Sequence, residues 1–234
     1  MTFRFKYANF SILFLILLFI FGGKTNGYCQ VFNYPEQDTD NWGIGLNVGL
    51  LHYRSNVNSG STIGCGITIS KIFTPVLGLR GDLMLGDLNG ETALYSFKSH
   101  LIETTINGTV NVSKIIFGNE INKLINVYGL IGIGTTDLQG NTIEKSTDTV
   151  VKRYGYGAGK GFFGYQRNGV FNTGIGASFS FVYNLKATLE FDLKFMRGDM
   201  MGDPYVSKLD SYTYTSFSLI YQLPFARKFH WKCQ

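Results

Sequence analysis

Polar and apolar residues alternate along several segments of the chain. The alternation is strictest between residues 186 and 195, where every even position is polar or charged and every odd position is apolar. A period of two predicts a β-strand with one polar and one apolar face. Counting this segment, eight strands of about 11 to 14 residues are expected, and a tilted strand needs about 9 to 11 to cross a bilayer. They are Trp42–Tyr53, Ser61–Lys71, Val76–Leu88, Ser99–Val112, Ile125–Thr135, Val170–Val182, Lys186–Arg197 and Ser211–Leu223.

The polar faces of these strands carry small residues. A soluble surface holds about 25–35% charged residues, whereas this chain has 16% overall, with 29 glycines. Small polar side chains suit a crowded lumen, and the aliphatic rows would then face lipid. The pattern therefore predicts an all-β fold, an eight-stranded antiparallel up-and-down transmembrane β-barrel. Aromatic residues near the strand ends are expected to form interfacial girdles: Trp42, Tyr53, Phe97, Phe171, Phe195, Tyr212 and Tyr214.

Several charged residues share the inward face in this register. A Lys or Arg at the midplane of the lipid face costs about 2–4 kcal/mol, so these charges are expected inside the barrel. The favoured interpretation is a network of ion pairs and hydrogen bonds that fills the lumen, and the alternative is a narrow ion path. The predicted lumen network consists of Arg80, Asp82, Glu103, Glu190, Asp192 and Lys194.

The connections between strands alternate in length. Short ones, such as residues 72–75 and 183–185, are expected as periplasmic turns, and long ones, such as 138–169 and 198–210, as outer loops. Residues 113–124 should form a periplasmic turn but are long and apolar. We expect a short amphipathic element at the membrane interface there.

The N-terminus has the pattern of a cleaved signal peptide. Arg4 and Lys6 precede the apolar run Ile12–Phe21, which is too short to span a bilayer. The expected organisation is a signal peptide over 1–29, an N-terminal extension over 30–41, the barrel over 42–223 and a periplasmic tail over 224–234. Lipidation at Cys29 is a lesser alternative. The net charge of +5 is not gathered into a basic stripe, so no nucleic-acid partner is expected.

The predicted outer loop at 138–169 combines glycines and aromatic residues. Gly155, Gly157, Gly159, Lys160 and Gly161 imitate a phosphate-binding loop, but neither the preceding buried strand nor the following helix is expected. The aromatic residues could stack on sugars or dock a partner protein, although packing within the loop is favoured. These candidate contact residues are Tyr154, Tyr156, Phe162, Phe163 and Tyr165.

Catalytic chemistry has little support in the sequence. A serine nucleophile needs a base within hydrogen-bond reach, and the only histidines are His52, His100 and His230. His52 and His100 fall near outer strand ends with serines nearby, so a lipid-hydrolysing pair is conceivable, but interfacial polar residues are the favoured interpretation. Cys65 and Cys233, the cysteines left after cleavage, are expected as independent thiols. We therefore predict no catalytic, cofactor or metal site.

From Trp42 to Phe225 the chain resembles the small barrel family of Bacteroidetes outer membranes, similar to the barrel half of OmpA-like proteins and to related porin-like domains. The phrases that carry the resemblance are Gly66–Arg80, Ile125–Gly134 and Tyr212–Tyr221. The family's usual peptidoglycan-binding domain is not expected, because only a short tail follows Leu223.

The resemblance implies a Gram-negative outer-membrane location and a non-enzymatic, structural or surface-interaction role. The alternatives are an accessory subunit of a secretion or gliding complex, or a narrow small-solute porin. The implied partners are outer-membrane lipid and a protein that binds the outer loops or the periplasmic tail.

Overall fold

The computed structural model describes residues 41–54, 58–91, 94–118, 125–157, 159–182, 184–196 and 210–223. The predicted signal peptide and C-terminal tail, together with Cys233 and His230, lie outside these residues. No helix within the described ranges is long and apolar enough to cross a membrane. The elements are β1 (Asn41–Arg54), β2 (Asn58–Ser59), β3 (Ser61–Ile72), β4 (Leu77–Glu91), β5 (Tyr95–Asn111), α2 (Val112–Phe117), β6 (Ile125–Glu144), β7 (Thr149–Tyr154), η1 (Phe162–Gly164), β8 (Gln166–Val182), β9 (Leu185–Met196) and β10 (Asp210–Leu223).

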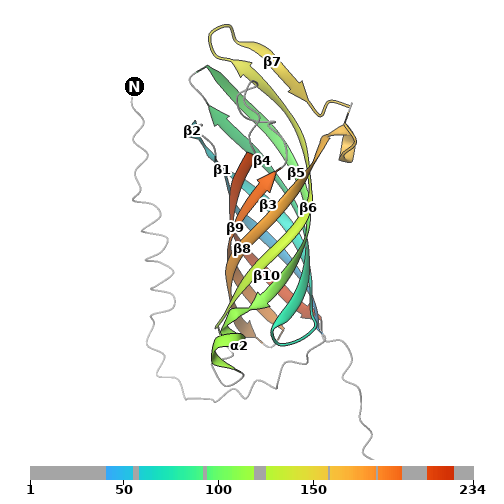
Figure 1. Cartoon of the computed structure of the whole chain (residues 1–234), viewed down its shortest axis with the longest axis vertical. Coiled ribbons are helices and arrows are strands. Elements are labelled where there is room, and N and C mark those ends of the chain that lie inside the picture. Colours follow the sequence, from blue (N-terminus) through green and yellow to red (C-terminus); the bar gives the residue numbers. More distant parts are fainter. Residues whose placement is uncertain are drawn as a thin grey trace, which may run out of the picture. The chain divides into compact units, whose positions relative to one another are not determined.

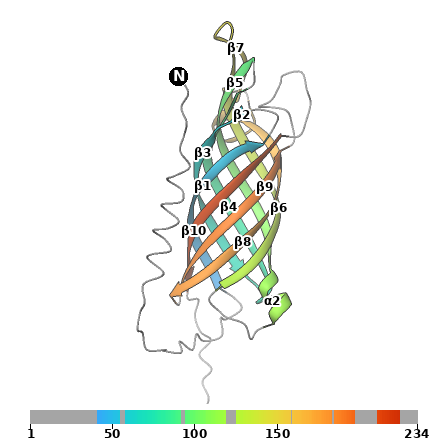
Figure 2. The same cartoon turned by 90° about the vertical axis from the view of Figure 1, so that its left-hand side faces the viewer.

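Eight of the strands close into a barrel (Figures 1 and 2). Their order is β4-β3-β1-β10-β9-β8-β6-β5, and pairing of β4 with β5 completes the ring. All of these pairings are antiparallel. The predicted eight-stranded antiparallel barrel is thus confirmed. The short strands β2 and β7 pair with β4 and β6 beyond the ring.

The wall is longer than predicted at one end, here called the β7 end (Figure 1). β5 begins at Tyr95, before the predicted Ser99, and β6 runs to Glu144 rather than ending at Thr135. Beyond Leu138, β6 exchanges its partner β8 for β7. The prediction that 138–169 is entirely a loop was therefore wrong, because sheet pairing continues above the apolar rows, where polarity no longer alternates.

The aliphatic rows lie on the outside of the barrel, as predicted. Leu46 and Ile133 are 68% and 69% exposed, and the neighbouring outward positions are exposed as well. Pairing across the wall forbids side chains at some inward positions: a Cβ on Gly45 would lie 2.8 Å from the Leu219 carbonyl oxygen. Small residues therefore line the inside, and apolar ones coat the outside.

Four of the predicted girdle residues instead point inward. Tyr53, Phe97, Tyr212 and Tyr214 are buried within the barrel. Their positions have the inward parity: Tyr212 and Tyr214 continue the row of Ser216 and Ser218, which are also buried. They join an apolar cluster at the β7 end made of Leu51, Tyr53, Met84, Leu88, Phe97, Leu101, Leu138, Tyr154, Met196, Tyr212 and Tyr214.

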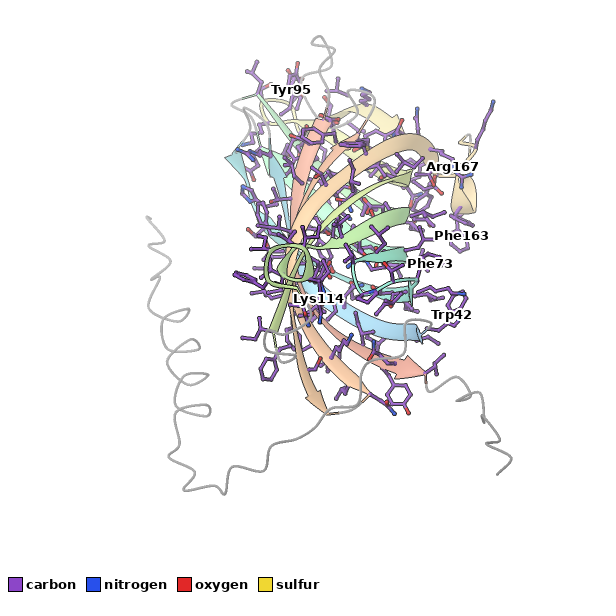
Figure 3. All side chains as sticks on the ribbon, turned by 60° about the horizontal axis from the view of Figure 1, so that its bottom comes forward. Trp42, Phe73, Tyr95, Lys114, Phe163 and Arg167 are labelled. Carbon is purple, nitrogen blue, oxygen red and sulfur yellow. The ribbon has the colours of Figure 1, made fainter. Side chains whose placement is uncertain are left out.

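The opposite end, here called the α2 end, carries short connections. Residues 73–76 join β3 to β4, and α2 follows β5 directly, with the Asn111 side chain accepting a hydrogen bond from the Lys114 amide. The outermost apolar residues of α2, Ile115 and Ile116, are 59% and 64% exposed. The first part of the predicted amphipathic element is thus a helix, which Figure 3 shows end-on beside Lys114; residues 119–124 lie outside the described ranges.

Candidate functional site

The lumen holds a buried cluster centred on Arg80. Its guanidinium lies 2.8 Å from the Asp82 carboxylate and 2.5 Å from the Glu190 carboxylate. Glu190 lies on β9, across the barrel from β4. Tyr128 also donates to Glu190. Charge-assisted hydrogen bonds of this kind are stronger than neutral ones, so β4, β6 and β9 are linked across the interior.

Uncharged side chains extend this cluster. Asn107 donates to Asp82 over 2.7 Å, and Thr68 does so over the same distance. Asn172 donates in turn to the Asn107 side-chain oxygen at 3.0 Å. The network therefore reaches β3, β5 and β8.

A second buried cluster lies nearer the β7 end. Lys194 forms an ion pair with Glu103, and the Tyr212 hydroxyl donates to the same carboxylate. The Lys194 ammonium also lies 5.3 Å from the centre of the Tyr214 ring, a cation–π distance.

Asp192 is the sixth residue of the predicted network and also faces inward. It is 3% exposed, and its Oδ1 has no hydrogen-bond partner among the described residues. A Cβ on Gly174 would lie 2.2 Å from that oxygen, which shows how closely the carboxylate approaches the β8 backbone. The structure therefore brings all six predicted residues into one lumen and gives five of them ion pairs.

The apolar cluster at the β7 end closes the lumen above these charges. Tyr53 and Phe97 meet edge to face at 5.1 Å, and the Tyr53 hydroxyl donates to Asp210 at 2.5 Å. Tyr154, carried by β7 beyond the ring, hydrogen-bonds with Ser99. Burial raises the pKa of Tyr154 to about 12, so it stays neutral at physiological pH. The interior thus has two layers: the apolar cluster at the β7 end, and the polar network between it and the α2 end.

The glycine-rich segment after β7 is folded against the outer wall. Asp137 on β6 faces outward and accepts from Arg167 Nε and Nη2, both at 2.9 Å, and from the Phe162 amide at 2.8 Å. We call these three residues the outer clamp. Although burial acts to raise it, hydrogen bonds from Arg167 and Phe162 hold the pKa of Asp137 below its ordinary value.

The glycines of this segment serve packing rather than phosphate binding. A Cβ on Gly161 would lie 2.6 Å from the Asp137 carboxyl carbon, and one on Gly159 would lie 2.0 Å from the Tyr165 carbonyl oxygen. The helix that follows, η1, has only three residues. The resemblance to a phosphate-binding loop therefore has no structural counterpart here, and the close approach of backbones explains the composition.

The five candidate aromatic residues are divided by the structure. Tyr154 is buried in the apolar cluster, whereas Tyr156 and Phe162 are 53% and 52% exposed and Phe163 is 85% exposed. Phe162 lies under the Arg167 guanidinium at 5.3 Å, and Tyr165 meets Phe163 edge to face at 6.3 Å. Figure 3 shows Phe163 and Arg167 on the same side of the barrel. Tyr154 thus packs against the barrel, Phe162 and Tyr165 make contacts within the segment, and Phe163 stays largely exposed.

His52 and His100 face outward near the β7 end. His100 lies 2.5 Å from Asp87 rather than beside a serine. His52 Nδ1 lies 3.4 Å from Ser61 Oγ in an exposed position, at the long limit for a hydrogen bond. In the described part of the chain, no group of three His, Cys, Asp or Glu residues could hold a metal ion. Cys65 is an exposed free thiol on the outer face.

Known structures share this architecture, although no family model and no curated protein matches the chain. Neisserial surface protein A is similar with a TM-score of 0.47 and 10% identity, covering 78% of this chain and 97% of its own. Ail of Yersinia pestis gives 0.45 and 10%, covering 79% and 99%. The outer membrane protein OprG of Pseudomonas aeruginosa gives 0.42 and 10%, covering 79% and 97%. The chain itself folds as a closed eight-stranded antiparallel β-barrel.

Proposed function

We propose that this chain is a non-enzymatic integral outer-membrane β-barrel with a side-chain-filled lumen and a structural or surface-interaction role. It reaches the membrane through the signal peptide over 1–29, and its family is the small-barrel group that the sequence resembles. The observation that carries the proposal is the reversal of polarity: exposed aliphatic rows surround a buried network of Arg80, Glu190, Lys194 and Glu103. Water outside such a wall would face a continuous apolar surface, which soluble monomers rarely expose.

The closed lumen separates this role from that of a porin. An eight-stranded interior is just wide enough for side chains to fill it, and here both layers are filled. Ion pairs between β4, β5 and β9 cross the lumen, and the apolar cluster covers them. An ion entering from the β7 end would have to displace buried aromatic rings before it reached the ion pairs of Arg80 and Lys194.

Two measurements test the proposal together. Folded barrel in membrane fractions should migrate differently on gels before and after boiling, because the hydrogen-bonded ring survives detergent until it is heated. Purified protein in a planar bilayer should then give no steady single-channel current. Steady currents would refute the filled lumen and favour the small-solute porin, and recovery of the protein in the soluble fraction would refute membrane insertion.

The remaining alternative is an accessory subunit of an outer-membrane secretion or gliding complex. Its support is the outward-facing surface at the β7 end, where Tyr156 and Phe163 are exposed. Gentle detergent purification distinguishes the two roles. A lone monomer favours the simple barrel, whereas constant stoichiometry with one large envelope protein favours the subunit.

A further inference from the structure

An ordered aromatic projection lies on the outside of the barrel beside β6 and β8 (Figure 1). It consists of η1, Phe162–Gly164, held by the outer clamp. Asp137 lies on β6, four positions after the outward-facing Ile133. It pairs with Ile102 of β5, and Ile102 pairs with the exposed Leu85 of β4. The clamp therefore adjoins the edge of the apolar rows rather than the lumen.

Hydrogen bonds hold the projection in a defined place. Besides the three bonds to Asp137, the Gly159 amide donates to the Gly164 carbonyl at 3.0 Å and the Gly161 amide to the Tyr165 carbonyl at 2.8 Å. Gly161 packs directly on the Asp137 carboxylate. A segment that was only a connection between β7 and β8 would not need this fixed position on the outer wall.

Phe163 is strained and exposed at the same time. Its φ of 54° lies in the left-handed region, which bulky residues rarely adopt. Such strain persists where the surrounding structure enforces it, and it gathers at ligand contacts. Phe163 is 85% exposed, and its ring contact among the described residues is with Tyr165. The strained backbone conformation therefore does little to bury the Phe163 ring within the protein.

We propose that the projection enters the outer leaflet of the membrane, with Phe162 and Phe163 among the lipids and Arg167 and Lys160 at the level of the phosphates. The inference rests on the proposed membrane insertion and continues its lipid-facing surface. Aromatic rings favour the membrane interface, and cations near it are attracted to anionic lipid. Residues 137–169, which include the Asp137 partner of Arg167, carry five Lys or Arg against three Asp or Glu, a net positive balance that suits phosphate-bearing lipid.

Spin labels at three sites test the depth of the projection. The full chain, with its three cysteines replaced by alanine, is folded into phosphatidylcholine–phosphatidylglycerol vesicles with Phe163→Cys, Ile131→Cys or Ser146→Cys. Ile131 is an exposed residue of the lipid-facing wall, and Ser146 lies in the exposed turn between β6 and β7. We expect the labels at 131 and 163 to be protected from a water-soluble nickel chelate, and the label at 146 to be accessible to it.

The outcomes separate this inference from the proposed function. If the label at 131 is protected but the label at 163 is accessible to the chelate, the barrel is inserted but the projection does not enter the lipid. That result would overturn this inference and favour a partner protein as the ligand of the projection. Access at 131 would show that the barrel is not inserted and would overturn both. Asp137→Ala should abolish protection at 163 while leaving 131 unchanged, because it removes the clamp; protection retained at 163 would refute the role of the clamp.

Discussion

Arg80 has the clearest stabilising role among the described residues, because the buried carboxylate of Glu190 and the partly buried one of Asp82 both bond to it. Asp82 and Glu190 lie 2.8 and 2.5 Å from its guanidinium, and its side chain is 7% exposed. Removing one partner of a buried ion pair costs about 3–5 kcal/mol, since the remaining charges stay buried without compensation. We expect Arg80→Met to lower the free energy of unfolding by about this amount, measured by urea titration of the folded gel band.

Arg80→Lys is the matched control for this substitution. It keeps a positive charge but loses the planar guanidinium that bonds to both carboxylates. Its loss of stability should be clearly smaller than that of Arg80→Met. Equal stability of the wild type and Arg80→Met would contradict the view that the network stabilises the barrel.

The outer clamp should depend on pH through Asp137. Hydrogen bonds from Arg167 and Phe162 outweigh burial and lower the pKa of its carboxyl from an ordinary 3.8. A depressed pKa stabilises the clamped state fully above that ordinary value and loses this contribution as pH falls through the depressed one. A spin label at residue 163 should therefore keep the same mobility from pH 8 to about pH 5 and loosen only in stronger acid. Asp137→Asn should remove this acid transition, and loosening near pH 6 would contradict the assignment.

Period-two parity placed the six lumen residues on the inward face, and the structure brings them together. The same parity places Tyr212 and Tyr214 inside with Ser216, although aromatic residues near strand ends favour the membrane interface. The outer clamp was not predictable, because it depends on the register of two strands: Asp137 and Arg167 are 30 residues apart. The contact of Tyr128 with Glu190 depends on register in the same way, since both residues pair with Gly176 of β8, whose missing side chain lets them meet.

The glycines of strand β6 differ in the space that the fold leaves for a side chain. Gly132 faces inward, and a Cβ there would lie 2.1 Å from Asn107 Oδ1 and 2.4 Å from the Ile106 carbonyl oxygen. Because one of these atoms is backbone, the wall itself must shift. We expect Gly132→Ala to destabilise the barrel by about 1–3 kcal/mol, the usual cost of overpacking, measured by the same urea titration.

Gly129 of the same strand provides the control. A Cβ there meets nothing nearer than the Gly174 carbonyl oxygen at 4.0 Å. Gly129→Ala should leave stability unchanged or raise it by about 0.5–1 kcal/mol, since glycine within a strand is entropically costly. Equal losses for the two substitutions would show that crowding in the lumen is not what selects glycine.

The length of β6 could be predicted only in part. Alternation identifies Ile125–Thr135 as a strand because the inner and outer faces of the wall require different side chains at alternate positions, small or polar inside and apolar outside. Beyond Leu138 the strand pairs with β7, and polar residues occur on both of its faces. The pattern therefore ends at the edge of the apolar rows, although the backbone hydrogen bonds continue to Glu144.

The whole molecule combines closure with a filled interior. A closed ring leaves no strand edge in lipid, where an unsatisfied backbone group would be costly. The ion pairs then act across the ring rather than along it: Arg80 and Glu190 are 110 residues apart, and Lys194 and Glu103 are 91 apart. Strand pairing and lumen chemistry thus stabilise the same closed state.

The lengths of the strand connections predict the orientation of the barrel in the envelope. Outer-membrane barrels keep short turns on the periplasmic side and longer connections outside, and the α2 end has the short turn at 73–76 while the β7 end has extended strands and η1. Ser146→Cys at the β7 end should react with a membrane-impermeant maleimide on intact cells. Lys114→Cys in α2 should react only after the outer membrane is permeabilised, and the reverse pattern would place the aromatic projection in the inner leaflet.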